Sequence, residues 1–132
     1  MIQPLHSNKA PKALGPYSQA IVSGDLVFCS GQTPVDPETN QLVGQDIVPQ
    51  THRALDNLGL VLGATGLDFS HIVKTTVFLK NMADFERMNA VYGTYFGEHP
   101  PARSTIEVAR LPLDALVEIE CVAVNVPDTK NP

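Results

Sequence analysis

Residues 116–126, LVEIECVAVNV, carry the pattern that decides the fold. From Val117 onward apolar side chains occupy every second position, which is the period of a β-strand. The apolar face of this strand holds four residues, Val117, Ile119, Cys121 and Ala123. Glu118 and Glu120 fall on the opposite face. We therefore expect one face of the strand to pack in a core while the other presents two carboxylates.

Other strand-like segments lie along the chain. YSQAIVSGDLVFCSG, residues 17–31, predicts two short strands joined by the turn Ser23-Gly24-Asp25. HIVKTTVFLK, residues 71–80, is β-branched and apolar, which favours a strand. ARSTIEVA, residues 102–109, predicts the strand before the last one. Alternation there places Arg103, Thr105 and Glu107 on one shared face.

Two segments have the period of a helix. Asp46 is a suitable N-cap for the first helix, which should end near Gly63 or Gly66. Its apolar stripe consists of Val48, Ala54, Leu55, Leu58 and Leu62. Asp84 can cap a second helix, whose core-facing residues are Phe85, Met88, Tyr92 and Phe96. The order β-β-α-β-α-β-β predicts an α+β fold, with a mixed sheet and both helices on one face. A partner subunit is the simplest cover for the other face.

Length and composition limit the class of protein. The 132 residues predict a single domain over residues 1–132. Nine basic against fourteen acidic residues give a net charge of −5, and no basic cluster occurs, which argues against nucleic-acid binding. Neither a signal peptide nor a membrane-spanning stretch is recognisable, so we expect a cytoplasmic protein that does not bind membranes. Cys29 and Cys121, in unrelated strands, are expected to be buried reduced thiols, and the histidine spacing predicts no metal site.

Arg103 is the first candidate for chemistry. It begins an apolar, β-branched strand in PPARSTIEVARLP, residues 100–112. A guanidinium stays charged and its planar fork of donors fits a carboxylate. Together with a partly buried Glu118 it would form a site for a small carboxylic acid whose reaction needs proton transfer. The alternative is a structural salt bridge between neighbouring strands.

Three further positions combine polar groups with apolar surroundings. Ser30 and Gly31 follow an apolar strand, where a hydroxyl and backbone amides can hold an anion, although an ordinary turn explains them equally well. Tyr17, after Gly15-Pro16, can wall a pocket or simply pack. Asn89 on the second helix needs partners if it is buried, and otherwise faces solvent.

Several of these segments resemble one family when they are taken together. GPYSQA, SGQTPVDPETN, HIVKTTVFLKNMADFERMNAVY, PPARSTIEVARLP and VEIEC occur in the order found in the reactive intermediate (enamine/imine) deaminases, the Rid family, especially its deaminase A subgroup. The similarity runs from Ala13 to Val126, and the PARS segment is its most specific part.

The resemblance implies a chorismate-mutase-like fold and a homotrimer with a barrel-like centre and clefts between subunits. It implies a 2-iminobutanoate/2-iminopropanoate deaminase, a hydrolase that needs no cofactor. Such enzymes convert 2-aminoacrylate-type enamines and imines, released by pyridoxal-phosphate enzymes, into 2-keto acids and ammonia. The family's carboxylate-binding arginine corresponds to Arg103 and its acidic residue to Glu118. Its remaining substrate-binding positions correspond to Tyr17, Ser30, Gly31, Asn89 and Thr105.

Thr105 is a departure from the family pattern, because many members have cysteine there. The resemblance implies that the backbone at this position contacts the ligand, so we expect deaminase activity to persist. Thiol-dependent regulation at this position is put in doubt. Two other functions remain open: a non-catalytic protein that binds 2-keto acids in the same clefts, and an endoribonuclease, an activity known for some similar proteins.

Overall fold

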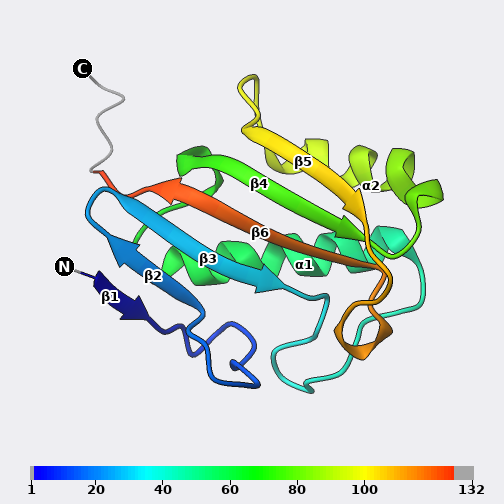
Figure 1. The fold of residues 1–132 in the computed structure, drawn as a ribbon, viewed down its shortest axis with the longest axis horizontal. Coiled ribbons are helices and arrows are strands. Elements are labelled where there is room, and N and C mark those ends of the chain that lie inside the picture. The colour runs from blue at the N-terminus through cyan, green and yellow to red at the C-terminus, as the bar shows by residue number, and fades with distance from the viewer. Residues whose placement is uncertain (1, 127–132) are drawn as a thin grey trace.

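The computed structural model describes residues 2–126 and shows one mixed sheet with two helices (Figure 1). The strands are β1 (Ile2–Leu5), β2 (Ala20–Ser23), β3 (Leu26–Gln32), β4 (Ile72–Leu79), β5 (Ala102–Glu107) and β6 (Val117–Val124). The helices are α1 (Ile47–Gly63) and α2 (Phe85–Tyr92). Four single-turn 3₁₀ helices accompany them, η1 (Phe69–His71), η2 (Met82–Asp84), η3 (Gly93–Tyr95) and η4 (Pro112–Asp114). No helix within residues 2–126 has the length and apolar character needed to span a bilayer.

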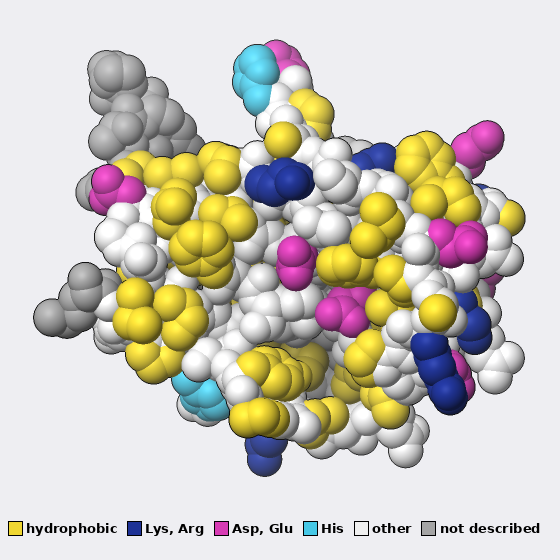
Figure 2. Space-filling view, in the orientation of Figure 1, with side chains coloured by type: hydrophobic (Ala, Val, Ile, Leu, Met, Phe, Trp, Pro, Cys, Tyr) yellow, Lys and Arg dark blue, Asp and Glu magenta, His cyan; other side chains and the backbone are white. Residues whose placement is uncertain are grey.

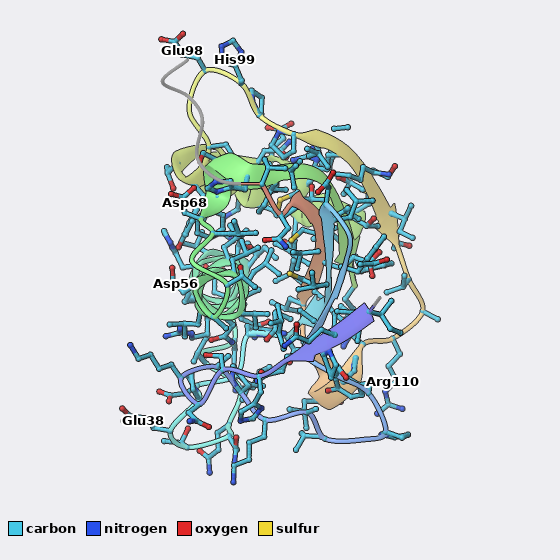
Figure 3. All side chains as sticks on the ribbon, turned by 90° about the vertical axis from the view of Figure 1, so that its left-hand side faces the viewer. Glu38, Asp56, Asp68, Glu98, His99 and Arg110 are labelled. Carbon is cyan, nitrogen blue, oxygen red and sulfur yellow. The ribbon has the colours of Figure 1, made fainter. Side chains whose placement is uncertain are left out.

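The sheet has the strand order β1-β2-β3-β6-β4-β5, so the last strand of the chain lies at its centre. All neighbouring pairs are antiparallel except β4 and β5, which are parallel. A parallel pair needs a crossover connection, and α2 supplies it. Both helices cover the same face, and the opposite face has no layer over it (Figures 1 and 3). This face is called the open face below.

Alternation along the strands builds the core. Val117, Ile119 and Ala123 of β6 are fully buried toward the helices, opposite the stripe of α1. In that stripe Leu55, Leu58 and Leu62 have no exposed surface, and each buried leucine contributes about 1.5–3 kcal/mol relative to exposure. Asp46 caps α1 as predicted, since its side chain accepts a hydrogen bond from the Val48 backbone N–H.

The prediction of an α+β fold with two helices on one face is confirmed, with three corrections. The strand β1 was not predicted. Asp84 makes no side-chain cap bond, because the single turn η2 precedes α2 and Asn81 caps that turn through its bond from Ala83 N–H. Cys29 and Cys121 are buried free thiols, but they are direct cross-strand partners of β3 and β6 rather than members of unrelated strands. Pairing between distant strands was not readable from either strand alone.

Candidate active site

Glu118 lies at the centre of the open face. It points away from the helices, as the alternation of β6 predicts, and is partly buried. Burial raises the pKa of its carboxyl group, and the nearby charge of Glu120 raises this pKa further. The carboxylate lies against the backbone of Gly31, where the Cβ of any other residue would come within 2.9 Å of Glu118 Cδ and still closer to Oε2. Because Gly31 has no side chain, it leaves the space that the Glu118 carboxyl group occupies against β3.

Ser30 and Tyr17 stand beside this carboxyl group. The Ser30 hydroxyl donates to the Ser18 carbonyl oxygen at 2.7 Å, and Ser30 N–H donates to the Gln19 carbonyl oxygen at 2.9 Å. These bonds fasten the segment that carries Tyr17 to the end of β3. Tyr17 is 53% exposed, and its hydroxyl accepts a bond from Leu14 N–H at 3.3 Å. The aromatic ring therefore forms a wall that solvent can reach.

An open cavity of about 550 Å³ joins these groups. Its lining includes Leu14, Tyr17, Ser30, Gly31, Thr33, Pro112, Leu113, Glu118 and Glu120. In the space-filling view of the open face, acidic side chains lie near the centre with hydrophobic side chains around them (Figure 2). We call this cavity, with its lining, the acid half-site. Four of the seven predicted site residues, Tyr17, Ser30, Gly31 and Glu118, belong to it.

Arg103 lies on the other side of the sheet. It pairs in register with the buried Thr75 of β4 and so faces α2. Its guanidinium carbon is 4.8 Å from the centre of the Tyr92 ring and 5.6 Å from that of Phe85. Tyr92 is itself fixed by a 2.7 Å hydrogen bond between its hydroxyl and that of Thr75. The two rings hold the cation by cation–π attraction and leave its donors available for an anion.

Thr105 and Asn89 accompany Arg103 on this side. Alternation puts Thr105 on the same face of β5, and Asn89 lies between Phe85 and Tyr92 on the same stripe of α2. Thr105 Oγ1 and Asn89 Oδ1 are both buried without a hydrogen-bond partner in the part of the chain that the structure describes. Unpartnered buried polar atoms are uncommon and often mark a functional region. We call Arg103, Thr105, Asn89, Phe85 and Tyr92 the arginine half-site.

One chain does not bring the two half-sites together. Arg103 faces the helices and Glu118 faces the open side, and β4 separates β5 from β6. Over residues 2–126 the ion pairs are His71–Asp68, Arg87–Asp46 and Arg110–Asp114, so Arg103 has no carboxylate partner there. Among residues 2–126, then, Arg103 does not form the salt bridge between neighbouring strands that was the alternative interpretation. No group of three or more potential metal ligands occurs among these residues.

Some residues of the half-sites were not identified as such from the sequence. Tyr92 and Phe85 were predicted only as core residues, because helical spacing does not show that a strand arginine lies over them. Pro112 and Leu113 had no signal in the pattern of alternation, since they belong to a turn. Glu120 was visible as the second acid of the VEIEC segment, and the structure places it in the same cavity as Glu118.

A family profile and several proteins of known sequence match this chain. The sequence profile described as endoribonuclease L-PSP matches residues 7–125. Protein DfrA of Myxococcus xanthus is 51% identical over 123 residues, covering 92% of this chain and 94% of that protein. The chloroplastic Reactive Intermediate Deaminase A of Arabidopsis thaliana is 50% identical over 117 residues, covering 89% of this chain and 63% of that protein.

A solved structure extends the agreement to three dimensions. TdcF of E. coli, crystallised with bound serine, has a TM-score of 0.88 and 40% identity, and the match covers 94% of this chain and 99% of that one. The matched profile spans nearly the whole described chain, including every residue of both half-sites. The chain therefore belongs to the endoribonuclease L-PSP family, which includes the reactive intermediate deaminases of the Rid group.

Proposed function

We propose that this protein hydrolyses 2-aminoacrylate-type enamines and their imine tautomers to 2-keto acids and ammonia. The observation that carries the proposal is Arg103, a guanidinium held by two aromatic rings and lacking a carboxylate partner among the described residues. Its donors suit the carboxylate of a 2-imino acid. Support also comes from the 50% identity to a protein named Reactive Intermediate Deaminase A. TdcF was crystallised with serine, an amino acid that carries a carboxylate group as a 2-imino acid does.

The reaction needs a positioned carbon, a water molecule and one acid–base group. Arg103 binds the substrate carboxylate through two donors and so fixes C2. An enamine first takes up a proton at C3 from solvent to give the protonated imine. Glu118 takes a proton from water as the water oxygen bonds to C2, and the C=N π electrons move to nitrogen to give the neutral carbinolamine. Glu118 then returns this proton to the nitrogen, the C2 hydroxyl loses its proton to solvent, and the C–N bond breaks, which releases ammonia and leaves C2 as the carbonyl carbon of the keto acid. Hydrolysis of this kind requires no covalent enzyme intermediate.

Because one chain keeps the two half-sites apart, we infer that they meet at an interface between two copies. β5 is an edge strand, so Arg103 lies near a border of the sheet where a second chain has access. A ligand that touches both Arg103 and Glu118 must lie between two copies. A head-to-tail contact forms a ring when its rotation closes, and we propose that it closes here into a homotrimer with three such clefts. Every cleft would then take its arginine from one copy and its glutamate from the next.

The experiment compares wild type with Arg103→Ala and Arg103→Lys while a dehydratase produces 2-aminoacrylate, and keto acid formation is followed. We expect both variants to lose the acceleration, Lys because it lacks the planar fork. Arg87→Ala is the matched control, since it removes an exposed arginine of α2 that pairs with Asp46. Wild-type rates in a folded Arg103→Ala protein would contradict the proposal.

The same assay separates the other two functions. A non-catalytic keto-acid sensor would bind pyruvate through Arg103 but would not accelerate keto acid formation. RNA cleavage is the activity in the name of the matched profile. The net charge of −5 and the two carboxylates of the acid half-site oppose an RNA backbone, so we expect no cleavage.

A further inference from the structure

The turn between β5 and β6 has an unusual backbone. Leu113 has φ 59° and ψ 20°, and Asp114 has φ 56°, so two consecutive residues other than glycine adopt the left-handed region. Leucine has no local hydrogen bond to offset the steric cost of this conformation, which is of order 1–2 kcal/mol. Strain of this kind persists where the surroundings enforce it, and it often lies beside functional sites.

The surroundings of the turn do enforce its shape. Leu111 and Ala115, on either side of the apex, are buried. Asp114 N–H donates to the Leu111 carbonyl oxygen at 3.0 Å, and Ala115 N–H donates to that of Pro112 at 3.1 Å. Arg110, labelled in Figure 3, donates from Nε to Asp114 Oδ1 at 3.0 Å. The buried anchors and backbone bonds hold the turn closed, and the leucine at its apex is left 55% exposed.

The exposed leucine belongs to the wall of the acid half-site. Pro112 and Leu113 line the cavity together with Leu14, which is 74% exposed, and Glu118. The cavity therefore has an acidic part, formed by Glu118 and Glu120, and an aliphatic part, formed by Leu14, Pro112 and Leu113. Nothing in the core of this chain requires an aliphatic side chain at residue 113, because the side chain points outward.

We propose that Leu113 is a specificity-determining residue, which the left-handed turn holds in place to contact the side chain of the 2-imino acid. The inference rests on the proposed deaminase function. With the substrate carboxylate on Arg103 and water at Glu118, the substrate side chain is the group left to meet the aliphatic part of the cavity. Aliphatic side chains such as that of leucine are then favoured. Acidic side chains are repelled by Glu118 and Glu120.

The test uses Leu113→Asn and Leu113→Met. Asparagine resembles leucine in shape, tolerates the left-handed conformation and removes the apolar surface. Methionine keeps the apolar surface and is the matched control. Imines are generated from alanine, leucine and aspartate by amino acid oxidases, and keto acid formation gives kcat/KM for each. Calorimetry measures binding of pyruvate and of 4-methyl-2-oxopentanoate to the same proteins.

We expect Leu113→Asn to lower kcat/KM for the leucine-derived imine about tenfold, with little change for the alanine-derived one. Leu113→Met should retain both activities, and the aspartate-derived imine should be poor for all three proteins. The melting temperature of Leu113→Asn should be equal to or above that of wild type. An equal fall for both imines, no fall for either, or a lower melting temperature with a changed oligomer mass would overturn the inference.

Failure of the deaminase proposal gives a different result. Wild type would then accelerate none of the imine hydrolyses, including that of the alanine-derived imine. The calorimetric comparison still decides the role of Leu113 in that case. A loss of affinity in Leu113→Asn restricted to 4-methyl-2-oxopentanoate supports the side-chain contact, and equal affinity of wild type and variant for both keto acids refutes it.

Discussion

At the scale of single residues, Glu118 shows how position determines chemistry. Its ordinary carboxyl pKa of 4.5 is raised by burial and by the charge of Glu120. A base with a raised pKa accepts a proton more readily at neutral pH than an exposed glutamate does. The alternation of VEIEC predicted which face carries this residue. The contact with Gly31 comes from a neighbouring strand and could not be predicted from that segment.

Glu118→Gln should lower turnover much more than it weakens pyruvate binding, because the amide keeps the size of the side chain but cannot take a proton. Steady-state kinetics and calorimetry on one preparation measure the two effects. Control measurements on Glu38→Gln, an exposed acid of a distant loop, should match wild type. Equal losses in turnover and binding would show that Glu118 only binds or only supports the fold.

The same variant should be more stable than wild type at neutral pH. A raised pKa in the folded state means that the folded chain binds more protons than the unfolded chain between pH 4.5 and the folded pKa. The free energy of unfolding therefore falls as pH rises through this window and stays lowered above it. Glu118→Gln has no carboxyl group to ionise, so its free energy of unfolding should exceed that of wild type at neutral pH but not below pH 4.5. Urea denaturation of both proteins at several pH values measures this difference. A difference that does not depend on pH would show that the raised pKa is not its cause.

At the scale of elements, β5 shows that alternation predicts the two faces of a strand but not the order of strands in the sheet. The pattern correctly placed Arg103 and Thr105 on one face. It did not reveal that β4 lies between β5 and β6, because strand order depends on tertiary packing. For the same reason Cys29 and Cys121 were not recognised as cross-strand partners. Asp84 does stand at the N-cap position of α2, which begins at Phe85, but its side chain makes no cap bond there, and nothing in the sequence indicated the 3₁₀ turn η2 that precedes it.

Thr105→Val should leave the free energy of unfolding unchanged or raise it by about 1 kcal/mol, because it replaces a buried hydroxyl that has no partner with a methyl group of similar size. Turnover should persist, since the ligand contact expected at this position is through the backbone. Chemical denaturation measures the free energy of unfolding of each protein. Thr105→Ser, which keeps the hydroxyl, is the control. A loss of stability in the valine variant alone would show that the hydroxyl has a partner in the assembled protein.

At the scale of the whole molecule, the open face is the surface that we propose a second copy of the chain covers. Phe28, Val73 and Ile106 are each more than two-fifths exposed, and the face has no layer over it. Apolar patches of this kind mark contact surfaces. The sequence predicted that this face needs cover. It could not predict which residues meet across the contact, because alternation describes one chain only.

The proposed trimer should have a mass near three times 14.3 kDa by light scattering. The clefts are proposed to combine the arginine half-site of one copy with the acid half-site of another. Arg103→Ala and Glu118→Gln therefore inactivate different walls of the same cleft. This arrangement makes the two variants capable of complementing each other.

The most direct measurement is the deaminase activity of mixed trimers, prepared by refolding equal amounts of Arg103→Ala and Glu118→Gln chains together. Each variant alone should be inactive. Random mixing leaves about one cleft in four with both wild-type walls, so the mixture should recover about a quarter of wild-type activity. A mixture that forms trimers but stays as inactive as its parents would contradict the shared cleft.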